Sequence, residues 1–134
     1  MELRPLRLHA GADLRQALEE ATKADAAVAA FVVAGIGSLV NARLRLAGAA
    51  QESVVVGPLE ILTLAGSLSA DGAHLHISVS DQDGRVLGGH VGYGNEVRTT
   101  VEVLLAFLPG WQLSRELDAI TGYKELVVRR QGSG

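Results

Sequence analysis

Residues 73–94, AHLHISVSDQDGRVLGGHVGYG, constrain the fold more than any other stretch of the sequence. The first part alternates between two sets of side chains. The apolar set comprises Leu75, Ile77 and Val79, and the polar set comprises His74, His76, Ser78 and Ser80. Because side chains in a β-strand repeat every two residues, the two sets lie on opposite faces of one strand. Asp83-Gly84 is a turn sequence, so the whole stretch predicts a β-hairpin.

This hairpin carries three of the four histidines in the chain: His74, His76 and His90. Imidazoles at positions i and i+2 of a strand stand roughly 6.5–7 Å apart on the same face, so their nitrogens can converge on one metal ion at about 2.0–2.1 Å each. Three nitrogen ligands would leave one position on zinc open, which is typical of catalytic rather than structural zinc sites. The competing interpretation is that they are solvated histidines on the polar face of a sheet.

The turn decides whether His90 joins the other two histidines. A two-residue Asp83-Gly84 turn would pair His76 with Val91 and point His90 to the opposite face. A three-residue loop of residues 82–84, with Gly84 in the left-handed region, would pair His76 with His90 instead. A shift of one residue therefore separates a hairpin with three histidines on one face from a hairpin without them.

The rest of the chain reads mainly as strands, with one helix. Strand patterns cover residues 3–9, 26–34, 39–46, 53–56, 59–68, 111–117 and 125–128. Residues 96–107 fit either a helix or a strand, and their β-branched side chains favour a strand. The helix begins after Asp13, with Gln16 three residues on as in a capping box, and its apolar residues recur with helical spacing to about Ala24.

Two glycine-containing segments are expected to break strands. Residues 35–38, GIGS, are expected to end the strand before them in a tight connection, and Gly57-Pro58 is expected to turn the chain. A phosphate-binding loop at residues 35–38 is disfavoured, because a strand pattern and not a helix follows it. We therefore predict an α/β (α+β) fold, a largely antiparallel sheet of seven to eight strands with one main helix.

Composition limits the classes of function. The 134 residues fit one domain, assigned to residues 1–130, with a flexible tail at 131–134. The lack of cysteine excludes disulfides and thiolate metal sites and fits a cytoplasmic protein. Neither a signal peptide nor an apolar run of about 18 residues is visible, so no membrane association is expected. Long apolar strands beside a single helix leave one sheet face uncovered, so we expect a homo-oligomer.

Several short motifs together resemble the PPC domain, the plant and prokaryote conserved domain. They are GIGSL at 35–39, GPLEIL at 57–62, AHLH at 73–76 and GGH at 88–90. The resemblance continues through REL at 115–117 and TGY at 121–123, and covers the chain from Arg4 to Val128. It implies a trimer-forming α/β domain, and in some prokaryotic members zinc ligands at the positions of His74, His76 and His90. With these histidines as ligands, His90 must lie opposite His76 and the turn must be odd in length.

The resemblance also implies partners. Plant members carry AT-hooks, short Arg-Gly-Arg-Pro segments that bind A·T-rich DNA, and their PPC domain mediates self-association and contacts with transcription factors. Their partner-contact motif matches the stretch from Gly57 to Leu62, with Pro58 and Leu59 substituted. This sequence has no Arg-Gly-Arg-Pro, and its net charge is −3, so we expect DNA binding to be weak or absent.

These observations predict a stand-alone, prokaryotic-type PPC protein, a homotrimer that binds a divalent metal, zinc by preference, at His74, His76 and His90. It would act through protein partners or as a DNA-binding regulator. The alternative is a zinc-dependent enzyme acting on a small molecule. A general base would then be needed near the metal. The candidates are Glu60, which we favour because it lies in a motif on a strand that leads into the hairpin, and Asp81 and Glu102.

Overall fold

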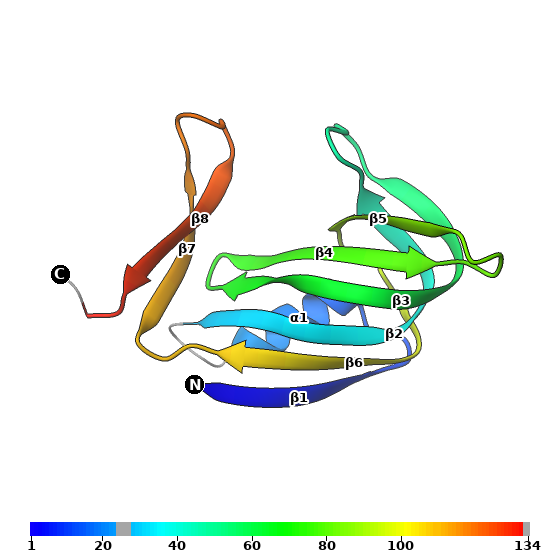
Figure 1. Ribbon diagram of the computed structural model, residues 1–134, viewed down its shortest axis with the longest axis horizontal. Helices are drawn as coiled ribbons and strands as arrows, with labels where there is room; N and C mark the ends of the chain where they lie inside the picture. Colours follow the sequence, from blue (N-terminus) through cyan, green and yellow to red (C-terminus); the bar gives the residue numbers. More distant parts are fainter. Residues whose placement is uncertain (24–27, 133–134) are drawn as a thin grey trace.

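The computed structural model describes residues 1–23 and 28–132, and Figure 1 shows its arrangement. In chain order the elements are β1 (Glu2–His9), α1 (Leu14–Lys23), β2 (Ala29–Arg45), β3 (Ser53–Ser69), β4 (Gly72–Ser80), β5 (Val86–Val91), β6 (Val97–Phe107), β7 (Trp111–Leu117) and β8 (Lys124–Arg130). Every strand pair is antiparallel. The predicted class, a largely antiparallel sheet with one helix, is confirmed for the described residues.

Six strands form the main sheet in the order β1-β6-β2-β3-β4-β5. The end of β2 also pairs with β5, Leu44 with Val91 and Arg45 with His90, so β2, β3, β4 and β5 close into a ring of pairings. The strands β7 and β8 form a separate two-stranded sheet that rises beside one end of the main sheet (Figure 1). This separate hairpin is the element that later supplies one wall of a pocket.

The core lies between one face of the sheet and α1, which crosses behind the strands in Figure 1. Leu14 and Leu18 of the helix are fully buried there, in one cluster with the apolar residues of β4. Burying a leucine side chain contributes about 1.5–3 kcal/mol, so this packing fixes which face of β4 turns inward. The histidines of β4 must then face away from the helix.

Local signals place the helix where the sequence predicts it. The Oδ2 atom of Asp13 accepts a hydrogen bond from the backbone N–H of Gln16 at 2.9 Å, which confirms the predicted cap. The predicted helix end at Ala24, the start of the strand at residue 26 and the last two residues of the predicted tail lie outside the described residues. The helix is too short to cross a membrane, and no other helix occurs in the described residues.

The prediction that residues 35–38 end a strand is wrong. β2 runs through them, with shifts in its register against β6 on either side. An added Cβ at Gly37 would overlap the carbonyl oxygen of Thr100 and lie 2.7 Å from the Cα of Val101. Gly37 also has a φ of 151°, so glycine here serves a close approach of two strands instead of a turn.

The predicted turn at Gly57-Pro58 is also wrong, because β3 runs continuously from Ser53 to Ser69. The two residues form an irregularity in the pairing with β2, where Leu39 pairs with Leu59 but Asn41 pairs with Val56. The side-chain Oδ1 of Asn41 accepts a hydrogen bond from the backbone N–H of Gly57 at 2.9 Å. A proline is tolerated inside a sheet at such a bulge, because no ladder hydrogen bond is required of it there.

Candidate metal centre

The β4–β5 hairpin has the register on which the histidine site depends. His76 pairs with His90, and Ser78 pairs with Gly88. The backbone N–H of Gly84 donates to the carbonyl oxygen of Asp81 at 3.0 Å, and Gly84 has a φ of 79°. These are the marks of a three-residue loop with glycine in the left-handed region. The predicted odd-length turn and the predicted pairing are confirmed.

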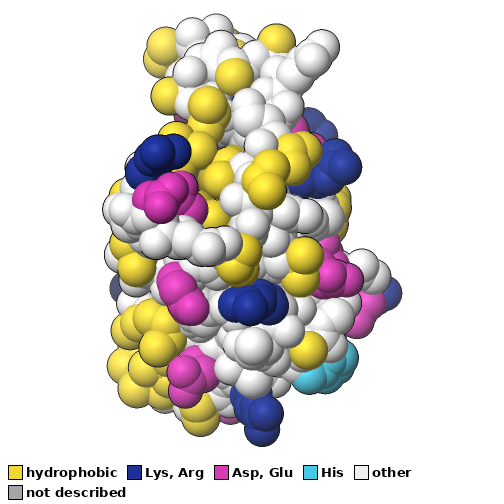
Figure 2. Space-filling view, turned by 90° about the vertical axis from the view of Figure 1, so that its right-hand side faces the viewer, with side chains coloured by type: hydrophobic (Ala, Val, Ile, Leu, Met, Phe, Trp, Pro, Cys, Tyr) yellow, Lys and Arg dark blue, Asp and Glu magenta, His cyan; other side chains and the backbone are white. Residues whose placement is uncertain are grey.

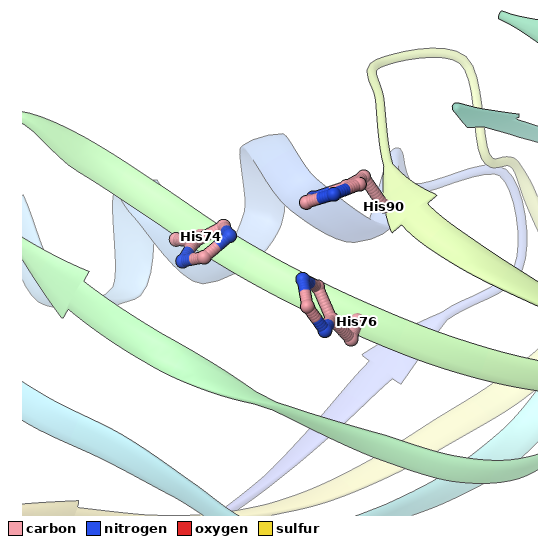
Figure 3. Close-up of side chains that lie close together, drawn as sticks. All are labelled: His74, His76 and His90. Carbon is pink, nitrogen blue, oxygen red and sulfur yellow. The ribbon is translucent and has the colours of Figure 1, made fainter. Parts of the chain in front are cut away.

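This register brings the three histidines together on the outer face of the sheet (Figure 3). Their ring centroids lie 5.0 Å (His74–His76), 5.6 Å (His74–His90) and 4.4 Å (His76–His90) apart. One ring nitrogen from each lies within 4.8 Å of the others. Ligands at about 2.0–2.1 Å from a tetrahedral zinc are about 3.4 Å apart, so small rotations of the rings would complete a metal site. Among the described residues, no acidic side chain joins this group.

His74 is also bound by an arginine from the separate hairpin. The Nη2 atom of Arg115 donates to the Nδ1 atom of His74 at 3.0 Å and to the Oγ atom of Ser67 at 2.8 Å. A guanidinium has no acceptor, so Nδ1 must accept, and the proton of the neutral ring is on Nε2. Ligation through Nδ1 would displace Arg115, and ligation through Nε2 would require a proton on Nδ1 that opposes it. Metal binding therefore requires Arg115 to release His74.

The surroundings of His74 and His90 favour their neutral forms. Burial lowers the pKa of His74 from 6.5 to about 4, with further contributions from the charge of Arg115, the other two histidines and Arg15. Burial also lowers the pKa of His90, assisted by His76 and Arg45. A neutral imidazole offers the lone pair that a metal needs, so a lowered pKa keeps His74 and His90 ready to bind a metal at neutral pH.

An open pocket of about 890 Å³ lies over the histidines. Its walls come from two parts of the molecule that project beyond β4 in Figure 1, the loop after β2 and the β7–β8 hairpin. Its charged lining residues are Arg15, Arg45, Arg115, Lys124, Asp71 and Glu125. Local sequence patterns do not predict that these residues come together, because they lie on the helix, on the main sheet and on the separate hairpin.

The acidic residues considered as general bases lie elsewhere. Glu60 pairs with Ser80 at the end of β4 that is farthest from His74. Asp81 lies in the hairpin turn, where its side chain accepts hydrogen bonds from backbone N–H groups, and Glu102 lies on β6. The structure brings none of them to the pocket, whose carboxylates are Asp71 and Glu125.

The fold and site define a small antiparallel β protein with a three-histidine group beneath a positively charged pocket. The chain belongs to the Plants and Prokaryotes Conserved (PCC) domain family, whose model matches residues 2–109. This range contains all three histidines and Arg45, whereas Arg115 and Lys124 of the pocket lie beyond it.

Three solved structures share the fold. A hypothetical protein from Salmonella enterica is 36% identical, with a TM-score of 0.93 and coverage of 97% of this chain and 94% of that one. A metal-containing protein from Archaeoglobus fulgidus is 27% identical, with a TM-score of 0.81 and coverage of 95% and 94%. A plant- and prokaryote-conserved protein from Pyrococcus horikoshii is 24% identical, with a TM-score of 0.78 and coverage of 92% and 90%.

Curated relatives are longer than this chain. Residues of a bifunctional protein named GlmU from a Synechococcus strain are 43% identical to it over 129 residues, which is 96% of this chain. The chain spans about a fifth (20%) of the length of that relative. The match therefore concerns one segment of a larger protein.

Proposed function

We propose that this protein is a metal-binding PCC-domain module that holds one divalent ion through His74, His76 and His90. The observation that carries the proposal is the convergence of three imidazoles, with one nitrogen of each within 4.8 Å of the others. Zinc suits three imidazole ligands and would retain one open position for a further ligand. The metal-containing relative from Archaeoglobus supports a metal in this fold.

The module would work as a homotrimer and through bound ligands or protein partners. Exposed apolar side chains on β2 and β3, among them Val33 and Val56 at 55% and 76% exposure, support an assembly that covers them. The Gly57–Leu62 region remains the proposed partner contact, and Leu62 is 46% exposed within it.

The test is the metal content of untagged protein after dialysis, measured by elemental analysis and native mass spectrometry. We expect one zinc per chain in the wild type and none in His76→Ala. His9→Ala is the matched control, because His9 lies on β1 outside the group and its loss should leave the metal in place. Wild-type protein without metal, or His76→Ala protein that retains it, would refute the proposal.

A second candidate function is a zinc-dependent reaction on a small molecule. The observation that favours it is the pocket of about 890 Å³ over the open side of the site, with Asp71 and Glu125 as its carboxylates. Glu60 would need to act from outside this pocket, so Glu125 is the better placed base. Hydrolysis of a small ester by wild-type protein, lost in both His76→Ala and Glu125→Gln, would support an enzyme. If fully metal-loaded protein did not hydrolyse the ester, the enzyme candidate would be refuted and metal binding would remain the proposed function.

Direct DNA binding, which the family resemblance implies, has little support from charge. The net charge is −3, and on the face in Figure 2 lysine and arginine side chains are interspersed with acidic ones. Non-specific DNA binding needs a concentration of positive charge along the phosphate backbone. We expect no electrophoretic shift at about 50 mM salt with micromolar protein, conditions at which non-specific binders are readily detected.

A further inference from the structure

The proposed metal centre lacks a negative charge to balance it. Three neutral imidazoles bring no charge, and a divalent ion would add two positive charges. The pocket around them carries four cationic side chains, Arg15, Arg45, Arg115 and Lys124, against two carboxylates, Asp71 and Glu125. Protein metal sites with a neutral ligand set commonly gain charge balance from an anionic ligand, and the three histidines that would hold the ion line this pocket.

Two of the four cations are not committed to other groups. Among the described residues, neither Arg45 nor Lys124 makes an ion pair. Arg15, by contrast, lies 3.6 Å from a carboxylate oxygen of Glu19 and stacks over the ring of Tyr93. Arg45 and Lys124 are therefore the two cationic side chains of the pocket whose positive charge is available to a ligand.

These two cations lie on different sides of the histidines. Arg45 on β2 pairs with His90 on β5, and directly paired residues project from the same face of a sheet. Lys124 begins β8, in the separate hairpin that forms the other wall. A ligand at the open metal position would therefore meet positive charge on both sides.

We infer, resting on the proposed metal site, that the pocket binds a small molecule with a carboxylate or phosphate group. One oxygen of that group takes the open metal position, and Arg45 and Lys124 bind its negative charge. The pocket volume falls within the roughly 300–1,000 Å³ of small-molecule sites. Arg115 strengthens the site, because the metal frees its guanidinium from His74, and guanidinium groups bind carboxylates and phosphates in a bidentate manner.

Isothermal titration of zinc-loaded protein with inorganic phosphate and, separately, with succinate tests the inference. We expect at least one of the two anions to bind wild-type protein, and the preferred one identifies the ligand class. Arg45→Gln and Lys124→Gln should each weaken that binding about tenfold, the value of one charge-assisted hydrogen bond, and both should retain one zinc per chain. Arg85→Gln is the matched control, because Arg85 lies in the β4–β5 turn outside the pocket, and it should bind as wild type does.

The outcomes separate this inference from the proposed function. Wild-type protein that retains no zinc refutes the metal site itself before any anion is added. Protein that retains zinc but binds neither anion overturns only the ligand inference. So does an Arg45→Gln/Lys124→Gln double variant that binds the anion as tightly as the wild type.

Discussion

His74 can bind either Arg115 or a metal ion, but not both in the present arrangement. Its Nδ1 atom accepts from the arginine at 3.0 Å, and the arginine is in turn anchored to Ser67 and, through its backbone N–H, to Asp71. In the metal-free protein, the guanidinium of Arg115 would thus compete with a metal ion for the Nδ1 atom of His74. The free energy needed to release Arg115 would lower the affinity of the site for a metal ion.

Replacement of this arginine tests the competition. Arg115→Met should bind zinc about tenfold more tightly than wild type, because it removes both the hydrogen bond to His74 and a positive charge beside the ion. Competition with a chromophoric chelator measures the affinity. Arg129→Met serves as the control, because Arg129 pairs with Glu116 on the same hairpin and does not reach the histidines. Unchanged or weaker zinc binding by Arg115→Met would contradict the competition.

The titration of His74 gives a second prediction at this scale. In metal-free protein its pKa should be about 4, because burial and the charge of Arg115 disfavour the protonated ring. The unfolded chain titrates near 6.5, so between pH 6.5 and 4 it binds more protons than the folded chain. The contribution of His74 to stability is therefore complete above pH 6.5 and is lost as the pH falls to 4. Imidazole shifts in an NMR titration measure the pKa directly, and a value near 6.5 would refute the prediction.

Among the elements, the β4–β5 turn holds the register of the site. Gly84 has a φ of 79°, and an added Cβ would meet no atom within 4 Å, so only backbone strain opposes a side chain there. Gly84→Ala should lower the free energy of unfolding by about 1 kcal/mol, measured by urea denaturation. Gln82→Ala in the same turn should change it by less than about 0.5 kcal/mol. Equal losses in the two variants would show that the left-handed glycine does not stabilise the turn.

The sequence predicts the features of this fold that depend on local interactions. The alternation in β4 and the cap of α1 are local, and the sequence predicts both correctly. The local turn residues allow two registers, and the family resemblance selects the odd-length turn that the structure contains. At residues 35–38 and 57–58, glycine and proline predict breaks in the strands that the structure does not contain. Only the neighbouring strands show that these residues accommodate a close approach and a bulge. Local spacing places the three histidines on one hairpin, and the family resemblance places them on one face. Arg115 and Lys124 come from a separate sheet whose docking no local pattern encodes.

At the scale of the whole molecule, apolar side chains remain uncovered. Hydrophobic groups gather in patches on the face shown in Figure 2. Val33 and Phe31 on β2 are 55% and 39% exposed, and Leu3 on β1 is 53% exposed. Leu3 and Phe31 lie in one row of the sheet, because both pair with Ala106 of β6. Such a surface is typical of an interface between protein chains.

Assembly can be tested by placing a charge on this surface. Native mass spectrometry of wild-type protein should give the mass of a trimer, and Val33→Lys should shift it toward the monomer because the lysine would be buried without a partner. The variant should fold as wild type does, within about 0.5 kcal/mol, because Val33 is exposed in the single chain. Lys23→Val, an exposed change on α1, should keep the wild-type mass. A monomeric wild type would refute the assembly.

The pocket is composed of two segments that need not change together. The histidines and Arg45 lie within the range matched by the family, and the β7–β8 hairpin, with Arg115 and Lys124, lies after it. Because the hairpin forms its own two-stranded sheet, its loop and Lys124 can change without breaking a strand pairing of the main sheet, whereas Arg115 is tied to His74 and Ser67. Such an arrangement makes the hairpin an exchangeable wall: a hairpin transplanted between relatives would change the ligand preference of the pocket while the three histidines keep their register.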